Sequence, residues 1–280
     1  MRRSILATTA FIATNLSLSF AAKPQMRPGI LELWRLDCGA IELSDSAPYS
    51  DGHLYDGQPR DMTDSCYLIR DGERYMLWDA GLPASLIDGP LTFGVHTISL
   101  HATLEDQLNE IGLAPADITF VGLSHYHFDH VGQAPVFANA TLLINRRDFE
   151  YVQSGADKDA SKGLAPWLSD TKRVKMNERD LDVFGDGLVT ILFTPGHTPG
   201  HSSLLIRLPR MGNVLLSGDA VHFREQIDNR GVPTFNTNRA DTLASIDRLE
   251  QISNSINAKL IIQHDPRDIG LLPQFPESAK

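Results

Sequence analysis

The sequence predicts an α/β domain built from layers of strands and helices. Short apolar runs with strand character alternate with segments of helical spacing along the chain. Hydrophobic residues make up 42% and charged residues 21% of the 280 residues, which is typical of a globular protein and excludes a disordered or collagen-like chain. No internal repeat and no Pro/Gly/Ser-rich linker divides the sequence, so residues 22–280 are expected to form one domain.

A hairpin and a capped helix are the clearest elements in the first half of the chain. Strand-like runs cover residues 30–36, 66–70, 74–78 and 118–123. The dipeptide Asp71-Gly72 separates the second and third of these runs and is a strong signal for a tight turn between antiparallel strands. Residues 104–111 predict an amphipathic helix, with Thr103 as its N-cap and Gly112 as its C-terminal stop.

The second half continues the alternation and places polar residues at strand ends. Strands are expected at residues 140–144, 188–193, 203–208, 214–216 and 260–262, and helices at 146–152 and 242–252. The run that ends at residue 123 leads directly into His125, and the run that ends at residue 262 leads into His264. Loops at strand ends commonly carry functional side chains, so we expect the chemistry of this protein there.

The first 21 residues have the pattern of a secretory signal peptide. Arg2 and Arg3 precede a stretch, residues 5–20, that has no charge, and Ser19 and Ala21 supply the small residues of a cleavage site. A membrane anchor is the alternative, but the stretch is too short and too rich in Thr, Ser and Asn to span a bilayer comfortably. We therefore expect a periplasmic or secreted protein.

Net charge and cysteine content exclude several classes of function. The formal net charge of −10 becomes two units more negative when Arg2 and Arg3 are removed with the signal peptide. Such a surface repels phosphate backbones and anionic lipids, so neither a nucleic acid nor a membrane is expected as a partner. Cys38 and Cys66 are too few for a disulfide scaffold; they either form one bridge or are two buried free thiols.

A cluster of metal-ligand side chains follows the strand at residues 118–123. His125, His127, Asp129 and His130 fall within the six-residue sequence HYHFDH. Imidazole and carboxylate are the groups that cations such as Zn²⁺ coordinate in proteins. A turn after a strand can direct the first two histidines toward one cation and the last two side chains toward another. The alternative is an exposed polar loop with unrelated histidines.

The order of motifs along the chain resembles that of the metallo-β-lactamase superfamily. H-x-H-x-D-H after a strand is the signature of that superfamily. The remaining motifs are Asp79 in WDAG, His197 in TPGHTPGH, Asp219 in SGDA, and His264. The resemblance covers roughly residues 30–265. It implies an αββα sandwich, in which two mixed β-sheets pack face to face with helices outside, and a site at one edge of the sandwich.

The resemblance also implies which side chains hold metal. One of two zinc ions would be held by His125, His127 and His197, and the other by Asp129, His130 and His264, with Asp219 bridging the two. Asp79 matches an aspartate that usually supports the ligands through hydrogen bonds. His201 is ambiguous, because it follows His197 by four residues, whereas the first histidine of such a pair is the ligand in relatives. His53, His96 and His101 match no motif and are interpreted as surface or loop residues, although His96 or His101 could line the pocket.

The metal constellation itself predicts hydrolysis. Two cations that share a carboxylate also share a hydroxide, because coordination lowers the pKa of water toward neutrality. That nucleophile suits an electrophilic carbonyl or phosphorus. We therefore predict metal-assisted hydrolysis, with Asp129 and Asp219 at the reacting centre.

Within the superfamily, the chain most resembles the N-acyl-homoserine lactonases. The likeness rests on HYHFDH, on the small size of the chain and on residues 218–225, 232–236 and 242–245. It implies an enzyme that opens the lactone ring of N-acyl-homoserine lactones by attack of a metal-bridging hydroxide. A dinuclear hydrolase of phosphotriesters or β-lactams is an alternative, and a non-catalytic periplasmic binding protein is another. The intact set of seven ligands argues against the last.

One position departs from the lactonase pattern. Several lactonases carry a tyrosine three residues after the bridging aspartate, where its hydroxyl contacts the substrate carbonyl, and this chain has His222 there. We interpret His222 as a catalytic residue whose imidazole N–H replaces the phenol; the alternative is a histidine that only packs beside the site.

An acyl chain would need an apolar channel. Candidate walls are Phe128, Trp167, Phe223 and Phe235, and residues 155–168 are a candidate covering loop. Because aromatic residues are more often core than pocket, the sequence cannot separate these two roles. It also leaves the oligomeric state open, a homodimer included.

Overall fold

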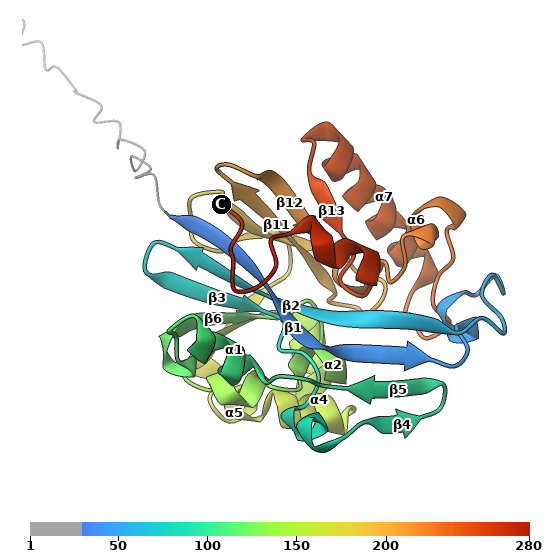
Figure 1. Ribbon diagram of the computed structural model, residues 1–280, viewed down its shortest axis with the longest axis horizontal. Coiled ribbons are helices and arrows are strands. Elements are labelled where there is room, and N and C mark those ends of the chain that lie inside the picture. Colours follow the sequence, from blue (N-terminus) through green and yellow to red (C-terminus); the bar gives the residue numbers. More distant parts are fainter. Residues whose placement is uncertain (1–29) are drawn as a thin grey trace, which may run out of the picture.

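Two mixed β-sheets pack face to face in this computed structural model, which describes residues 30–280 (Figure 1). The larger sheet has the strand order β4-β5-β1-β2-β3-β6-β7-β8 and the smaller sheet the order β13-β12-β11-β10-β9. The strands of the larger sheet are β1 (Leu31–Leu43), β2 (Arg60–Asp71), β3 (Arg74–Trp78), β4 (Leu91–Phe93), β5 (His96–Ser99), β6 (Ile118–Gly122), β7 (Thr141–Asn145) and β8 (Val174–Asn177). The strands of the smaller sheet are β9 (Leu181–Asp182), β10 (Val189–Phe193), β11 (Ser202–Leu208), β12 (Gly212–Leu216) and β13 (Lys259–Ile261).

Helices cover the outer face of each sheet. Five follow strands of the larger sheet, namely α1 (Leu104–Glu110), α2 (Phe128–Val131), α3 (Arg146–Gln153), α4 (Lys158–Gly163) and α5 (Ala165–Ser169). The other two are α6 (Glu225–Asn229) and α7 (Arg239–Ser255), which lie on the opposite side in Figure 1. The predicted αββα sandwich is therefore confirmed. The signal-peptide prediction for residues 1–21 lies outside the described residues.

The core between the sheets explains the alternation of apolar residues along the strands. Successive strand residues point to opposite faces, so Tyr67 and Ile69 of β2 face the smaller sheet while Cys66 and Leu68 face the helices. Trp78 and Met76 of β3 join the layer between the sheets and are fully buried. Burial of each such side chain contributes about 1.5–3 kcal/mol, so this layer holds the two sheets together.

Local signals in the sequence correctly predicted the β2–β3 hairpin and the N-terminus of α1. The hairpin β2–β3 pairs Asp71 with Arg74, and Gly72 between them has a φ of 61°, a left-handed conformation that suits glycine. Thr103 caps α1, with its hydroxyl accepting from the backbone N–H of Asp106, whose carboxylate accepts from the backbone N–H of Thr103 in return.

Residues 155–168 do not form the loop that the sequence analysis expected. This segment forms α4 and α5, and Trp167 lies in the core behind them with its indole N–H donating to the carbonyl of Ala140 at 2.9 Å. The side chain is fully buried among apolar residues and does not line the site. An aromatic residue with a satisfied N–H is a common core component, so Trp167 belongs to the core and is not a wall of the site.

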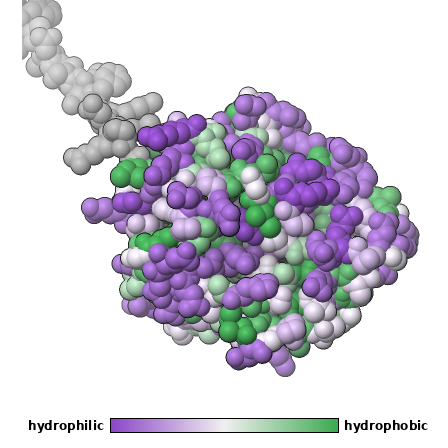
Figure 2. All heavy atoms as spheres, viewed as in Figure 1, coloured by the Kyte–Doolittle hydropathy of each residue, from purple (hydrophilic) through white to green (hydrophobic). Residues whose placement is uncertain are grey.

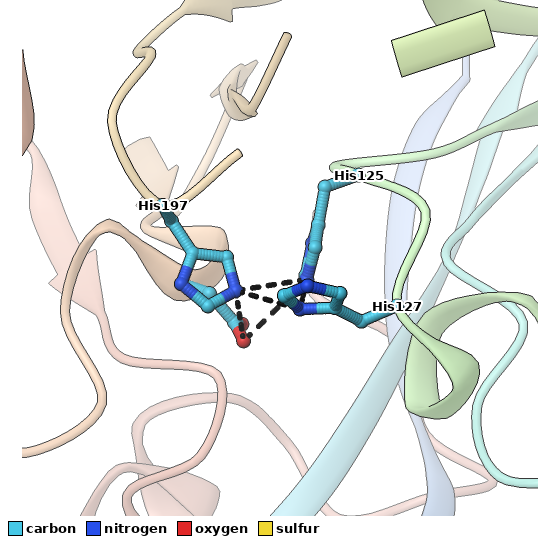
Figure 3. Close-up of side chains that lie close together, drawn as sticks. His125, His127 and His197 are labelled. Carbon is cyan, nitrogen blue, oxygen red and sulfur yellow. Dashed lines mark hydrogen bonds and ion pairs between the residues drawn. The ribbon is translucent and has the colours of Figure 1, made fainter. Parts of the chain in front are cut away.

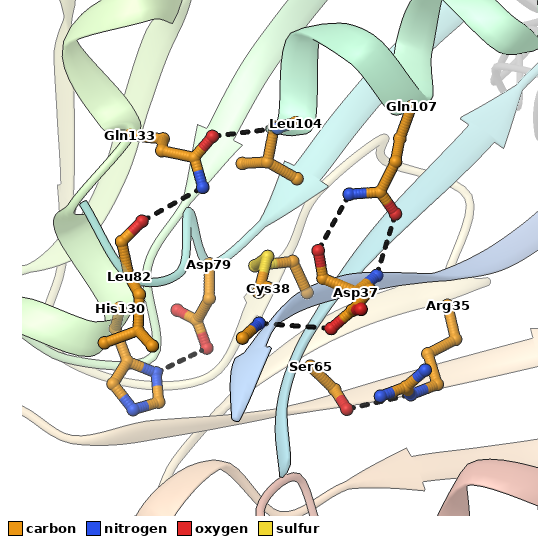
Figure 4. The surroundings of a disulfide bond; sticks show 12 residues. Arg35, Asp37, Cys38, Ser65, Asp79, Leu82, Leu104, Gln107, His130 and Gln133 are labelled. Atoms are coloured by element: carbon orange, nitrogen blue, oxygen red, sulfur yellow. Dashed lines mark hydrogen bonds and ion pairs between the residues drawn. A yellow bond between two sulfur atoms is a disulfide. The ribbon is translucent and has the colours of Figure 1, made fainter. Parts of the chain in front are cut away.

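Cys38 of β1 and Cys66 of β2 are joined by a disulfide bond, so the alternative of two free thiols is wrong (Figure 4). Both residues are fully buried. The bridge lies close to Asp79 and His130 in Figure 4, and a Cβ atom added to Gly81 would lie 2.6 Å from the sulfur of Cys38. The disulfide therefore joins β1 and β2 next to the turn that carries Asp79 and Gly81.

The surface drawn in Figure 2 mixes hydrophilic side chains with small groups of hydrophobic ones. Within residues 30–280, no helix combines the length and the apolar character that crossing a membrane requires.

Candidate metal centre

Five strands end at one edge of the sandwich; the segments that follow four of them carry the seven proposed ligands, and Asp79 follows the fifth. β3 and β6 are parallel neighbours, and so are β12 and β13, while β10 has the same direction as β12 because both pair antiparallel with β11. Within each sheet the carboxyl ends of these strands therefore lie at the same edge, and contacts between side chains from the two sheets show that the two edges meet. The ligand side chains follow β6 (His125, His127, Asp129, His130), β10 (His197), β12 (Asp219) and β13 (His264).

Three imidazoles converge on one point (Figure 3). Nε2 of His125 lies 2.9 Å from Nδ1 of His127 and 3.1 Å from Nε2 of His197, and these last two nitrogens are 2.9 Å apart. The carboxylate oxygen Oδ2 of Asp219 lies 3.3 Å from Nε2 of His197. Together these four side chains form one group of possible metal ligands.

A second group lies on the other side of Asp219. It comprises Asp129, His130 and His264. The other carboxylate oxygen of Asp219, Oδ1, is 3.3 Å from Nε2 of His130 and 3.1 Å from Nε2 of His264. The structure thus brings together all seven residues that the sequence singled out, with one oxygen of Asp219 facing each group.

Hydrogen bonds on the far side of the rings leave the inward nitrogens free. Nδ1 of His197 faces Oδ1 of Asn236 at 2.8 Å, and Nδ1 of His264 faces the carbonyl of Thr63 at 2.9 Å. Because both partners are acceptors, Nδ1 carries the proton in each ring and Nε2 keeps a lone pair toward the centre. Such outward bonds are typical of histidines that bind metal.

The unpaired atoms of the cluster fit divalent cations. Among the described residues, Nε2 of His130, Nε2 of His264 and Oδ1 of Asp219 are buried and have no hydrogen-bond partner. Burying polar atoms without partners is costly, and three lone pairs directed at one point repel one another unless a cation lies between them. Imidazole and carboxylate donors in this number suit borderline metals, zinc among them.

The pKa shifts of the histidines also indicate that the cluster favours a bound positive charge. Burial lowers the pKa of His125 and His197 well below the usual range of histidine, so both imidazoles are neutral and able to bind a cation. Burial also disfavours the charged form of His264, but neighbouring carboxylates, Asp219 foremost, outweigh burial and raise its pKa to about 9. The carboxylates around His264 thus favour positive charge at this point, which is the charge that a bound metal ion would supply.

Asp79 and His201 support the cluster without joining it. One oxygen of Asp79 accepts from the backbone N–H of Ser124 at 2.7 Å, and the other is 3.0 Å from Nδ1 of His130. Nε2 of His201 accepts from the backbone N–H of Asp219 at 2.8 Å, while its Nδ1 donates to the carbonyl of Thr194 at 2.8 Å. His201, which the sequence left ambiguous, therefore positions Asp219 and has no free nitrogen for a metal.

Asp148 is a supporting residue that the sequence analysis missed. It lies in the first turn of α3 and is fully buried, and its two oxygens accept from the backbone N–H of Gly200 and from the hydroxyl of Thr198, both at 2.6 Å. A Cβ atom at Gly200 would lie 2.6 Å from the Asp148 carboxylate, so only glycine fits. These bonds hold the loop that carries His197. An acidic residue in a helix usually faces solvent, so the sequence offered no signal for this role.

His222 lies against the cluster, as the sequence predicted. Its Nε2 is 3.2 Å from Oδ2 of Asp219, and its ring stacks on His264 with a centroid distance of 5.6 Å and an interplanar angle of 7°. Nδ1 is buried and has no partner among the described residues. The ring also meets Tyr49 edge to face at 5.2 Å.

A cavity of about 210 Å³ opens above the cluster. Phe128 and Phe235 line it, as expected for two of the four aromatic candidates. Phe223 does not line it. The ring of Phe223 packs on Tyr55, and the guanidinium of Arg60 lies 4.2 Å from the centre of that ring. The remaining lining residues include Tyr49, Phe93 and His96. The sequence analysis did not identify Tyr49 or Phe93 as cavity residues. Of its two interpretations of His96, the one that places this residue on the wall of the pocket is confirmed.

Comparisons with known proteins agree with this geometry. Residues 60–264 match the family described as Metallo-beta-lactamase superfamily. An N-acyl homoserine lactonase (AttM) from Rhizobium radiobacter is 35% identical over 182 residues, which are 61% of this chain and 67% of that protein. An N-acyl homoserine lactonase from a Bacillus species is 30% identical over 256 residues, which cover 89% of this chain and 98% of the relative.

Solved structures of such lactonases share the fold. One, an N-acyl homoserine lactone hydrolase with the product N-hexanoyl-L-homoserine bound at the catalytic metal centre, superimposes with a TM-score of 0.75 at 28% identity. The match covers 89% of this chain and 98% of that one.

Proposed function

Because the chain belongs to the metallo-β-lactamase superfamily, we propose that it is a dinuclear metal hydrolase that opens the lactone ring of N-acyl-homoserine lactones. The observation that carries this proposal is the position of Asp219, whose two oxygens face two separate groups of ligands within about 3.3 Å of His197 and of His130. The lactonase relatives and the product-bound structure supply the substrate class.

The two groups of side chains would each hold one metal. His125, His127 and His197 belong to the first, and Asp129, His130 and His264 to the second, with Asp219 shared between them. We propose zinc for both positions, since its preferred donors are those present. When bound, the cations would supply a water of lowered pKa as nucleophile and would polarise the lactone carbonyl.

The residues of the chain have separate tasks in ring opening. Asp219 would be shared by the two metals, and His201 holds its backbone in place. His222 borders the cavity beside Asp219, where an imidazole N–H can donate to the carbonyl oxygen as negative charge develops on it. Asp129 is the less buried of the two carboxylates in the cavity, which places it to accept a proton from the attacking water and to pass it to the oxygen that leaves when the ring opens.

A second cavity next to the site suits the acyl chain. It has a volume of about 570 Å³ and shares Phe93 and Phe128 with the cavity above the cluster. Its other walls are mainly apolar and include Leu86, Leu91 and Val131. Apolar walls stabilise a hydrocarbon chain by removing it from water, at about 0.8 kcal/mol for each buried CH₂ group.

We also propose that the protein is exported. The buried disulfide between Cys38 and Cys66 supports this proposal, because such bonds persist in the periplasm and outside the cell and are rare in the cytosol. The mass of the protein recovered from the periplasm or medium tests the cleavage site: loss of residues 1–21 is expected, and retention of the full chain in the cytosol would contradict export.

Product analysis tests the proposed reaction. The zinc-loaded protein is incubated with N-hexanoyl-homoserine lactone, with chelated protein as the control. Ring opening gives N-hexanoyl-homoserine with its acyl chain intact and releases one proton per turnover. Free hexanoic acid would mean amide cleavage, and turnover of a phosphotriester or a β-lactam without turnover of the lactone would assign the protein to one of the alternative classes.

A further inference from the structure

Two side chains, Tyr49 and His96, form a polar pair on the wall of the cavity above the cluster. The hydroxyl of Tyr49 lies 3.1 Å from Nε2 of His96. Both residues line the cavity, and among residues 30–280 the only other lining side chain with a strong hydrogen-bonding group, apart from the proposed metal ligands, is His222. Tyr49 and His96 take no part in the ring opening described above.

The ring of Tyr49 is held firmly in place. It contacts His222 and Phe235 edge to face, with centroid distances of 5.2 and 5.3 Å. The side-chain amide of Gln226 donates to the carbonyl of Tyr49 at 2.9 Å and accepts from the backbone N–H of His222 at 2.7 Å. His96 is fixed in turn by stacking on Phe93 at 5.2 Å and 18°. The pair is therefore preorganised, which reduces the entropic cost of a contact with a ligand.

The hydroxyl keeps hydrogen-bonding capacity beyond its contact with His96. A phenol has one donor and two acceptor positions, and Tyr49 uses one of these toward the imidazole. Burial, followed by the charges of Asp129 and Asp219, raises the pKa of Tyr49 above its usual range, so the phenol keeps its proton. It can then accept from an N–H or donate to a carbonyl, according to which way the hydrogen bond with His96 runs.

An N-acylated lactone offers one polar group that the reacting centre does not use. In the proposed reaction its lactone carbonyl would lie at the metal centre beside His222, and its amide is attached to the ring carbon next to that carbonyl. We infer that Tyr49, oriented by His96, hydrogen bonds this amide and so selects N-acylated lactones over lactones that lack an amide. The inference rests on the proposed function and extends it to the recognition of the substrate.

Substrate selectivity tests the inference. The value of kcat/KM is measured for N-hexanoyl-homoserine lactone and for an α-alkyl-γ-butyrolactone of similar chain length, which keeps the ring but has no amide. One neutral hydrogen bond corresponds to a ratio of about 3- to 10-fold. The ratio of the two kcat/KM values should therefore fall about 3- to 10-fold in Tyr49→Phe, mainly through KM of the amide substrate.

The controls separate recognition from folding. Tyr55→Phe removes the hydroxyl of another buried tyrosine, which bonds Asn229 and does not line the cavity, and should leave the ratio unchanged. His96→Phe should lower the ratio in the same direction, and His96→Gln, which keeps a hydrogen-bonding group, should restore part of it. An equal loss on both substrates, no loss on either, or the same selective loss in Tyr55→Phe would overturn the inference. A wild-type protein that opens no N-acylated lactone would contradict the proposed function and this inference with it.

Discussion

Nε2 of His222 lies 3.2 Å from Oδ2 of Asp219, the same carboxylate oxygen that faces His197. The histidine is therefore in contact with the proposed reacting centre, and its ring is fixed by stacking on His264. A side chain that only packed behind the site would not direct a ring nitrogen at the shared carboxylate. This geometry favours a role for His222 in stabilising charge that develops on the substrate.

Replacing His222 by Phe should lower kcat more than it raises KM. A donor to a developing oxyanion acts mainly on the transition state, and losing one typically costs on the order of 10²–10³ in turnover. Since the metals also stabilise this charge, we expect a loss of about 10- to 100-fold. His222→Tyr, which restores a donor, should keep much of the activity. Wild-type kcat in His222→Phe with full metal content would show that the histidine only packs.

The buried carboxyl of Asp148 should make stability depend on pH. Burial is the main cause that raises its pKa to about 7, against about 3.9 in an unfolded chain. The folded state therefore holds this proton to a higher pH, so the contribution to stability is complete below about pH 4 and is lost as the pH rises through 7. We expect the free energy of unfolding of wild type to fall relative to Asp148→Asn by roughly 2–4 kcal/mol over that range.

Urea unfolding of both proteins at several pH values measures this difference. The Asn variant has no titrating group at the position and is the matched reference. A difference between the two that stays constant from pH 4 to 8 would mean that Asp148 remains charged in the folded protein.

Loss of the disulfide should destabilise the protein. Cys38 and Cys66 are separated by 28 residues, and closing a loop of this size in the unfolded chain corresponds to roughly 3–4 kcal/mol in the chain-entropy account. The midpoint of urea unfolding should therefore fall in the presence of a reductant. The double variant with alanine at both positions should unfold at the lower midpoint and should not respond to the reductant. Equal midpoints for oxidised and reduced wild type would contradict a stabilising bridge.

The apolar cavity beside the site should set the preference for acyl-chain length. Leu91 lines this cavity and is 53% exposed, so Leu91→Asn changes the wall at little cost to the fold. The ratio of kcat/KM for N-decanoyl- to N-butanoyl-homoserine lactone should fall about 3- to 5-fold, the equivalent of about one buried CH₂ group. Ile87→Asn, at a neighbouring exposed residue outside the cavity lining, should leave the ratio unchanged. Equal ratios in wild type and Leu91→Asn would mean that the acyl chain of the substrate does not bind in this cavity.

The proposed ligands could be found from the sequence because they lie in short motifs directly after strands. The direction of those strands then brings the motifs together, since β6, β12 and β13 all end at the same edge. Sequence alone could not show which nitrogen of each ring faces inward. Outward partners decide that, and Asn236 and the carbonyl of Thr63 belong to distant segments.

The walls of the cavity could not be predicted, because they depend on pairing between distant segments. Tyr49 and His96 are 47 residues apart, and they meet because β1 pairs with β5, with Leu43 opposite His96. Trp167 shows the reverse case: its aromatic character suggested a wall, yet its indole N–H finds a partner in the core. Whether an aromatic side chain lines a site or fills the core is settled by tertiary packing, which local patterns do not contain.

Zinc titration of the metal-free protein tests the two-metal centre most directly. Protein treated with a chelator is supplied with increasing amounts of zinc, and both bound metal and the rate of opening of N-hexanoyl-homoserine lactone are measured at each step. Because Asp219 faces both groups of ligands, we expect activity to rise until close to two equivalents are bound and then to stay constant. Full activity with a single equivalent bound, reproduced in independent preparations, would contradict the shared role of Asp219.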